Sequence, residues 1–258
     1  MRTELRLPLG ILYAFLLVLF RVAGAILFVP LPGFGSAPSV ARAVFAVALT
    51  LCLFPAWPHL AILGPVPLDR LAGWAASESA FGVLVGVTVG FIVEGFQLAA
   101  QLINLQAGYS YVSAVDPNSE ADSTVLQVAM QLASSLLFFS LGLDRQVIRV
   151  LADSLQWFPA GSFWPSFRLG DGLVRLGSGM FLTGVKLAMP VVALVILVDL
   201  AMALFGRMQA QLQLLSLAFP LKMLAAIALL AALAPLLPAA LESAAGRSLE
   251  ILLGMLRS

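Results

Sequence analysis

Apolar residues run through this sequence in long blocks that are separated by short polar segments. Six blocks have the length and composition of helices, and they cover roughly residues 9–29, 38–55, 71–106, 125–142, 169–205 and 214–237. A helix that crosses a typical bilayer needs about 20 mainly apolar residues. The pattern therefore predicts an all-α, polytopic membrane protein of about six apolar helical segments, forming one domain over residues 1–258.

Two of these blocks, 71–106 and 169–205, are longer than one crossing requires. At ~1.5 Å per residue a helix over 71–106 would be about 54 Å long, whereas the hydrocarbon core is about 30 Å thick. Both are expected to tilt, bend or protrude, and Pro190 is expected to kink the second. Residues 143–158 and 239–258 read as amphipathic helices, and the first is predicted to lie along the membrane surface.

The composition supports this class and excludes others. Hydrophobic residues make up 61% and charged residues 10%, against roughly a quarter charged in an average soluble domain. A net charge of +1 without a basic cluster argues against a nucleic-acid partner. One cysteine and one histidine leave no internal disulfide and no thiolate or imidazole cluster, so no metal and no cofactor are expected.

The first block admits two interpretations. Arg2 and Arg6 precede it, as basic residues precede the apolar core of a cleaved signal peptide. However, Arg21 interrupts the expected cleavage region and apolar residues continue beyond it. A retained first helix is therefore favoured.

Segment 71–106 has two different halves. In the first, Gly82, Gly86 and Gly90 recur every four residues, which brings one helix face close to a neighbour, within or between subunits. In the second, polar residues at spacings of three and four form one stripe: Glu94, Gln97, Gln101 and Asn104. Such a stripe should face protein or an aqueous space rather than lipid, so polar packing and pore lining both stay open.

A polar loop follows this segment and holds two of the three tyrosines, together with three carboxylates and no basic residue. Gly108 is expected to end the incoming helix, and Asp116 before Pro117 fixes a turn. The candidate functional positions are Gln106, Gly108, Tyr109, Ser110, Tyr111, Val112, Asp116 and Pro117. The alternative is an ordinary interhelical loop.

The ionisable residues considered as candidate buried charges of the apolar blocks are Glu94, Lys186, Asp199 and Lys222. As buried charges they require partners, and a Glu94–Lys186 pair is one option. They form no catalytic constellation, so no catalytic residue and no enzyme activity are predicted. A stand-alone secondary transporter, with its site at Pro-broken helices and Lys186, Asp199 and Lys222, is the alternative function. Against it, the sequence shows no internal repeat.

The basic residues predict an orientation. With the N-terminus in the cytoplasm, the outer segments hold only Arg42 and Arg207. The inner segments then hold Arg2, Arg6, Arg70, Arg145, Arg149, Arg168, Arg247 and Arg257. By the positive-inside rule, the polar central loop lies on the far side of the membrane.

The central loop resembles the hallmark of the FliR family, the export-gate subunits of the flagellar type III secretion apparatus. The resemblance is carried by Gln106-x-Gly108-x-Ser110-x5-Asp116-Pro117. Further matching positions extend over nearly the whole chain: Arg21, Pro30, Pro38, Arg42, Gly142, Pro159, Pro190, Arg207, Gln211-Leu212 and Phe219-Pro220-Leu221.

The chain also departs from that family pattern. Gln101 stands where Glu is usual, Asn104 where Gly is usual, and Ala210 replaces a proline. Ala107 occupies a position where the injectisome homologues, the SctT group, tend to have Arg. This residue favours the flagellar branch.

The resemblance implies a function and a set of partners. Such a chain would form helical hairpins within a larger, closed helical assembly with FliP and FliQ homologues, and an FlhB homologue would attach at its base. The assembly would be the entry channel for unfolded flagellar proteins, in the inner membrane at the flagellar basal body. Exported flagellar proteins would be transient partners, and membrane lipid would surround the assembly.

The resemblance also assigns a role to the central loop. In this family the loop is a plug inside the channel, beside a methionine-rich constriction supplied by FliP. Here the plug would be residues 108–122, with Tyr109, Tyr111 and Val112 as the bulky stoppers.

Overall fold

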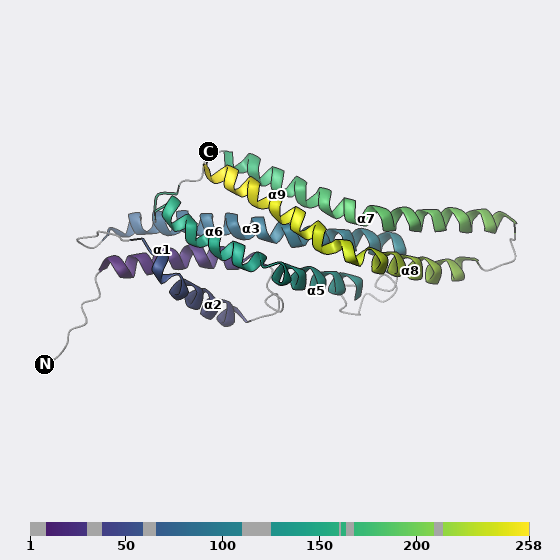
Figure 1. Cartoon of the computed structure of the whole chain (residues 1–258), viewed down its shortest axis with the longest axis horizontal. Coiled ribbons are helices and arrows are strands. Elements are labelled where there is room, and N and C mark those ends of the chain that lie inside the picture. The colour runs from purple at the N-terminus through teal and green to yellow at the C-terminus, as the bar shows by residue number, and fades with distance from the viewer. Residues whose placement is uncertain are drawn as a thin grey trace. The chain divides into compact units, whose positions relative to one another are not determined.

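The computed structural model describes residues 9–29, 38–58, 66–109, 125–159, 161–163, 168–208 and 214–257, and the regular structure of this part is helical (Figure 1). Its helices are α1 (Leu9–Ile26), α2 (Ser39–Cys52), α3 (Leu68–Ala107), α5 (Val125–Ser140), α6 (Leu143–Trp157), α7 (Arg168–Met208), α8 (Leu214–Leu233) and α9 (Leu237–Arg257). Single 3-10 turns occur at Phe54–Ala56 and Ala234–Leu236. The predicted all-α class is confirmed.

Four segments are long and apolar enough to cross a membrane: Leu9–Ile26, Leu68–Ala107, Leu169–Arg207 and Ala218–Leu256. Helices α5 and α6 qualify only as a pair, which is bent by 61° at a short break. Helix α2 has 14 residues and is too short by itself. The structure thus supports four or five spans where the apolar pattern suggested about six segments.

The two over-long segments are single helices. Helix α3 has 40 residues and α7 has 41, so each is about 60 Å long at ~1.5 Å per residue. Helix α7 continues through Pro190 as one element. Pro235 has a different effect, because it lies in the 3-10 turn that separates α8 from α9.

The chain forms two compact units. Unit 1 comprises Met1–Gly90, Gly142–Val174 and Leu249–Ser258, and unit 2 comprises Phe91–Leu141 and Arg175–Ser248. In unit 1, apolar side chains of α1, α2 and α6 share one core with Leu53: Val18, Val22, Ile26, Ala46 and Leu155. Helix α1 is therefore a central element of this core.

Helix α6 has its apolar face inside unit 1. Leu143, Val147, Leu151 and Leu155 are buried, whereas Arg145 and Arg149 are exposed. The amphipathic pattern was predicted to place this helix on the membrane surface, with its apolar face towards lipid. In the structure that face is covered by protein, so the amphipathicity reflects packing within the chain.

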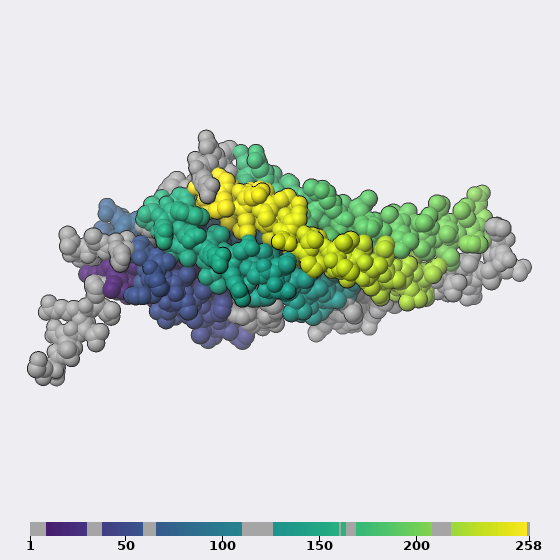
Figure 2. Space-filling model, viewed as in Figure 1, coloured from purple at the N-terminus to yellow at the C-terminus, as the bar shows by residue number. Residues whose placement is uncertain are grey.

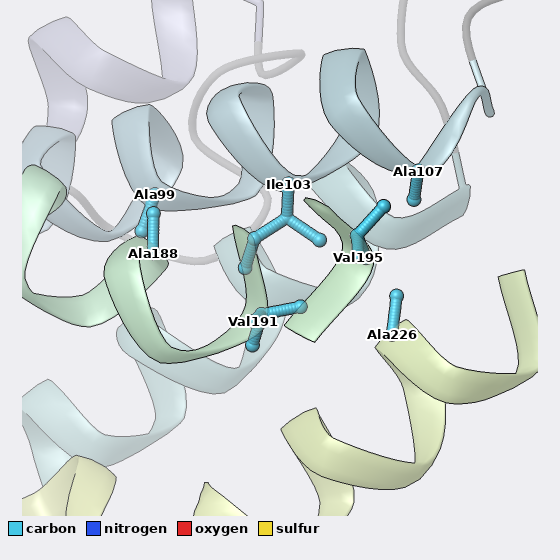
Figure 3. Packing of buried hydrophobic residues seen from close by; sticks show 7 residues of the cluster. All are labelled: Ala99, Ile103, Ala107, Ala188, Val191, Val195 and Ala226. Carbon is cyan, nitrogen blue, oxygen red and sulfur yellow. The ribbon is translucent and has the colours of Figure 1, made fainter. Parts of the chain in front are cut away.

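In unit 2, α3, α7 and α8 pack through small side chains. Figure 3 shows the cluster of Ala99, Ile103, Ala107, Ala188, Val191, Val195 and Ala226 between these helices. Spacings of three and four place each helix's members on one face. Other faces of α7 and α8 are uncovered, and both helices are visible at the surface in green and yellow-green in Figure 2. Leu197, Leu204 and Leu224 are among their exposed apolar residues.

Candidate functional site

The end of α3, where the central loop begins, is capped through Gly108. The backbone N–H groups of Gly108 and Tyr109 both donate to the Asn104 carbonyl oxygen, each at 3.1 Å. Gly108 has a φ of 83°, a left-handed conformation that glycine adopts without the steric penalty of a Cβ atom. The predicted helix end at Gly108 is thus observed, as a glycine C-cap.

Tyr109 is tied to helix α8. Its hydroxyl donates to the Met223 carbonyl oxygen at 2.8 Å, and its ring packs against the small-residue cluster of unit 2. Burial raises the pKa of the Tyr109 hydroxyl above its usual value. The stopper role that the resemblance suggested for Tyr109 stays a prediction, and within this chain the side chain contacts α8.

Phe219 of α8 closes over the same point. A Cβ atom on Gly108 would lie 3.0 Å from Phe219 Cδ1, so only glycine fits without displacing the ring. Lys222, one turn further along α8, has its Nζ 5.8 Å from the centre of the Phe219 ring and forms an ion pair with Asp199 of α7. Phe219, Met223 and Ala226 therefore form one α8 face against the end of α3.

The rest of the predicted loop site lies mostly outside the described residues. Gln106 is half-buried in the last turn of α3. The positions that lie outside the described residues are Ser110, Tyr111, Val112, Asp116 and Pro117. Their role as a plug stays a prediction.

The polar stripe of α3 is only partly covered by the chain. Glu94 and Gln101 are exposed, Gln97 is half-buried, and Asn104 is buried with 3% of its surface exposed. The C-terminal end of the stripe, Asn104, is part of the helix cap at Gly108, because its carbonyl oxygen accepts the capping hydrogen bonds. Glu94 and Gln101 present polar groups on the outside of the single chain.

The charged residues within the apolar helices do not form the Glu94–Lys186 pair that the sequence suggested. Lys222 pairs with Asp199, with 16% and 39% of their side chains exposed. Lys186 was predicted to be buried, but it is exposed on α7. Glu94 and Lys186 form no ion pair with each other in the described part of the chain. The reason is that the covered face of α7 is the one that carries Ala188, Val191 and Val195.

Gly82, Gly86 and Gly90 pack against α1 of the same chain. A Cβ atom on Gly82 or Gly86 would overlap a carbonyl oxygen of α1, and one on Gly90 would lie 3.0 Å from the Phe28 carbonyl oxygen. Gly24 of α1 contributes to the same contact, because its Cβ would lie 2.6 Å from the Ser79 carbonyl oxygen. The close approach that the glycine spacing predicted is therefore an intramolecular one.

A buried ion pair between Arg21 and Glu78 was not anticipated from the sequence. Arg21 Nε donates to Glu78 Oε2 at 2.6 Å, and the two side chains are 1% and 0% exposed. The guanidinium carbon lies 4.5 Å from the centre of the Phe81 ring. Opposite charges in two apolar helices were the signal available, but Arg21 and Glu78 are 57 residues apart in the sequence and no local pattern links them.

Further hydrogen bonds satisfy this pair. Arg21 Nη1 donates to Ser154 Oγ at 2.9 Å and Nη2 donates to the Phe158 carbonyl oxygen at 3.0 Å. The Gly161 N–H donates to Glu78 Oε1 at 2.8 Å. The network joins α1, α3, α6 and the turn after α6, and it fixes the geometry of unit 1.

These features define a polytopic membrane protein whose polar groups serve helix contacts and the root of one loop. The described residues hold no group of three metal-ligating side chains. The model of the family "Bacterial export proteins, family 1" matches residues 12–247. The chain belongs to this family, the FliR family of bacterial export proteins, and is thus a membrane component of export machinery rather than an enzyme.

Similar curated proteins cover most of the chain. It is 31% identical over 221 residues to the flagellar biosynthetic protein FliR of Escherichia coli (strain K12). The aligned region covers 85% of this chain and 83% of that protein. FliR of Caulobacter vibrioides is 26% identical over 221 residues, 85% of this chain and 87% of its own length. FliR of Bacillus subtilis (strain 168) is 26% identical over 215 residues, 81% of each chain.

Proposed function

We propose that this chain is a subunit of the flagellar type III protein export gate in the bacterial inner membrane, at the flagellar basal body. With FliP and FliQ homologues it forms the closed entry channel for unfolded flagellar proteins, and an FlhB homologue attaches at its base. The observation that carries this proposal is the family match over residues 12–247. The uncovered apolar faces of α7 and α8 support it, since a subunit of a larger assembly needs such surfaces.

The central loop is proposed to close this channel at rest. A channel wide enough for an unfolded polypeptide leaks ions unless bulky groups fill it. The root of the loop supports such a role: Gly108 supplies a hinge, and Tyr109 holds the first turn of the loop on α8 through Met223. Tyr111 and Val112 then stay as the proposed stoppers, while Tyr109 is assigned to anchoring.

The first test is assembly with conductance. The chain is co-expressed with the FliP and FliQ homologues of the same bacterium, and the purified complex is reconstituted into lipid bilayers. Deletion of residues 111–115 keeps Gly108 and Tyr109 in place, so the complex should assemble and conduct ions at rest where wild type does not. A stand-alone transporter would instead lose uptake of one solute without leaking.

Single-atom variants refine this test. Tyr109→Phe removes only the hydroxyl that bonds Met223, and the lost hydrogen bond should raise resting conductance by about twofold to tenfold. Tyr13→Phe is the matched control, because the Tyr13 hydroxyl accepts from the Val66 N–H within unit 1. If the deletion variant assembles and stays as tight as wild type, the plug assignment is wrong.

A further inference from the structure

One cation of α7, Lys186, lies within a long apolar stretch and forms no ion pair in the part of the chain that the structure describes. Lys186 is exposed, and its nearest charged residues along the helix are Arg175 and Asp199. Residues 176–198 hold no other charged side chain. As a helix this stretch is about 35 Å long, enough to cross a hydrocarbon core of about 30 Å, and Lys186 lies near its middle.

Lys186 belongs to an uncovered stripe along α7. Leu182, Met189 and Leu197 are 52%, 55% and 60% exposed. Spacings of three and four residues place the members of this α7 stripe on one helix face: Leu182, Lys186, Met189, Ala193, Leu197 and Leu200. This is the spacing of a helix face that packs against another helix through knobs-into-holes contacts.

Neither lipid nor water suits the whole stripe. Lipid tails would solvate the leucines but leave an ammonium at the centre of the bilayer, where ionisable groups are costly and normally face a partner or a water-filled space. A water-filled channel would solvate Lys186 but leave the row of Leu182, Met189 and Leu197 against water. An apolar helix that carries one carboxylate satisfies both parts.

A second copy of this chain is a poor occupant. Because Lys186 lies near the middle of the charge-free stretch, parallel or antiparallel pairing of two stripes in register brings two ammonium groups together. Like charges across an interface suppress association. The occupant must therefore be a different chain.

We propose that the α7 stripe packs against a transmembrane helix of another export-gate subunit, and that this helix carries an aspartate or glutamate opposite Lys186. This inference rests on the proposed function, because it requires a gate of several different subunits. To the proposed function it adds the chemistry of one contact between subunits and the residue, Lys186, that selects the partner helix. Lys186 then acts as a specificity determinant for assembly.

Cross-linking in the native complex tests the contact. A photo-crosslinking amino acid replaces Met189 on the stripe, or Phe205, which is 60% exposed and lies about 160° around α7 from Met189. Position 189 should cross-link to a subunit helix that contains Asp or Glu near the attachment point, and position 205 should not reach that helix. Cross-links from 189 to lipid alone, or to a helix without a carboxylate, would overturn the proposal.

Charge reversal tests the pairing. Lys186→Glu should lower recovery of the complex by at least about tenfold, because it sets two carboxylates against each other, and Lys186→Arg should stay close to wild type. Replacing the identified partner carboxylate by Lys should restore Lys186→Glu. Recovery of Lys186→Glu at the wild-type level would refute the pairing. If the wild-type chain itself does not co-purify with FliP and FliQ homologues, the proposed function fails instead.

Discussion

Arg21 and Glu78 carry full charges that are 1% and 0% exposed, and their hydrogen bonds reach three further groups. A buried ion pair gives little net stability over apolar residues of the same volume, but removing one member leaves an uncompensated charge. Removal of Glu78 costs more than the ion pair alone. The Gly161 N–H and the Arg21 guanidinium both donate to this carboxylate, so both would lose their acceptor. Neither member can therefore be removed alone without weakening the packing of α1 on α3.

We expect Glu78→Ala to lower the free energy of unfolding by about 3–5 kcal/mol, since Arg21 would stay buried without its counter-charge. The double change Arg21→Met with Glu78→Leu should recover most of this loss, because it removes both charges. Chemical denaturation of the purified gate complex in detergent measures the effect. Glu242→Ala, at an exposed position of α9, serves as the control. A wild-type denaturation midpoint for Glu78→Ala would refute the role of the pair.

At the scale of helices, the close approach of α1 to α3 depends on glycines, which have no Cβ atom. Gly24, Gly82 and Gly86 place backbone against backbone, so a single Cβ has no room. Gly95 and Gly184 make a similar contact between α3 and α7 in unit 2, where a Cβ on Gly184 would lie 2.9 Å from the Gly95 carbonyl oxygen. Small residues thus determine which helices can pair.

Two glycines of α3 provide a matched comparison. A Cβ on Gly86 would overlap the Ala25 backbone, whereas one on Gly73 would meet nothing within 4 Å. Gly86→Ala should destabilise unit 1 by about 1–3 kcal/mol through overpacking. Gly73→Ala should be neutral or stabilise by up to about 1 kcal/mol, since alanine favours the helix. Thermal denaturation compares the two, and equal effects would show that contact with α1 does not control stability.

The helices could largely be predicted from sequence, but their partners could not. Apolar length alone predicted α3 and α7 as over-long elements, and Gly108 marked the end of α3 correctly. Local patterns cannot tell whether an amphipathic helix faces lipid or its own chain, and for this reason the expected lipid contact of the apolar face of α6 was wrong. Glu78 was missed because its partner Arg21 is distant in the sequence.

At the scale of the molecule, the candidate site combines features that sequence could and could not predict. The root of the central loop was identified from Gly108 and Tyr109, but the contacts with Phe219 and Met223 depend on α8 returning to the end of α3. Exposure of Lys186 likewise depends on which face of α7 the other helices cover. The single domain over residues 1–258 stays a prediction. What the apolar pattern determines is the membrane class, and tertiary packing determines which polar residues are left for partners.

The orientation predicted from charge, which counts residues 38–55 as one crossing, is open to direct measurement. Arg145 and Arg149 are exposed on α6, so they are available to the cytoplasmic side, as the positive-inside rule requires. Reporter fusions after Ser258 and between residues 164 and 168 should report the cytoplasm, and one at Asn118 should report the periplasm. The physical reason is that arginines beside a span resist translocation, and the outer segments hold only Arg42 and Arg207. A variant with fewer arginines on the cytoplasmic side supplies the control. Replacing Arg145 and Arg149 by Gln should weaken the cytoplasmic signal at 164–168 without changing the helices. A periplasmic signal after Ser258 in the wild-type chain would reverse the assignment and place the central loop in the cytoplasm.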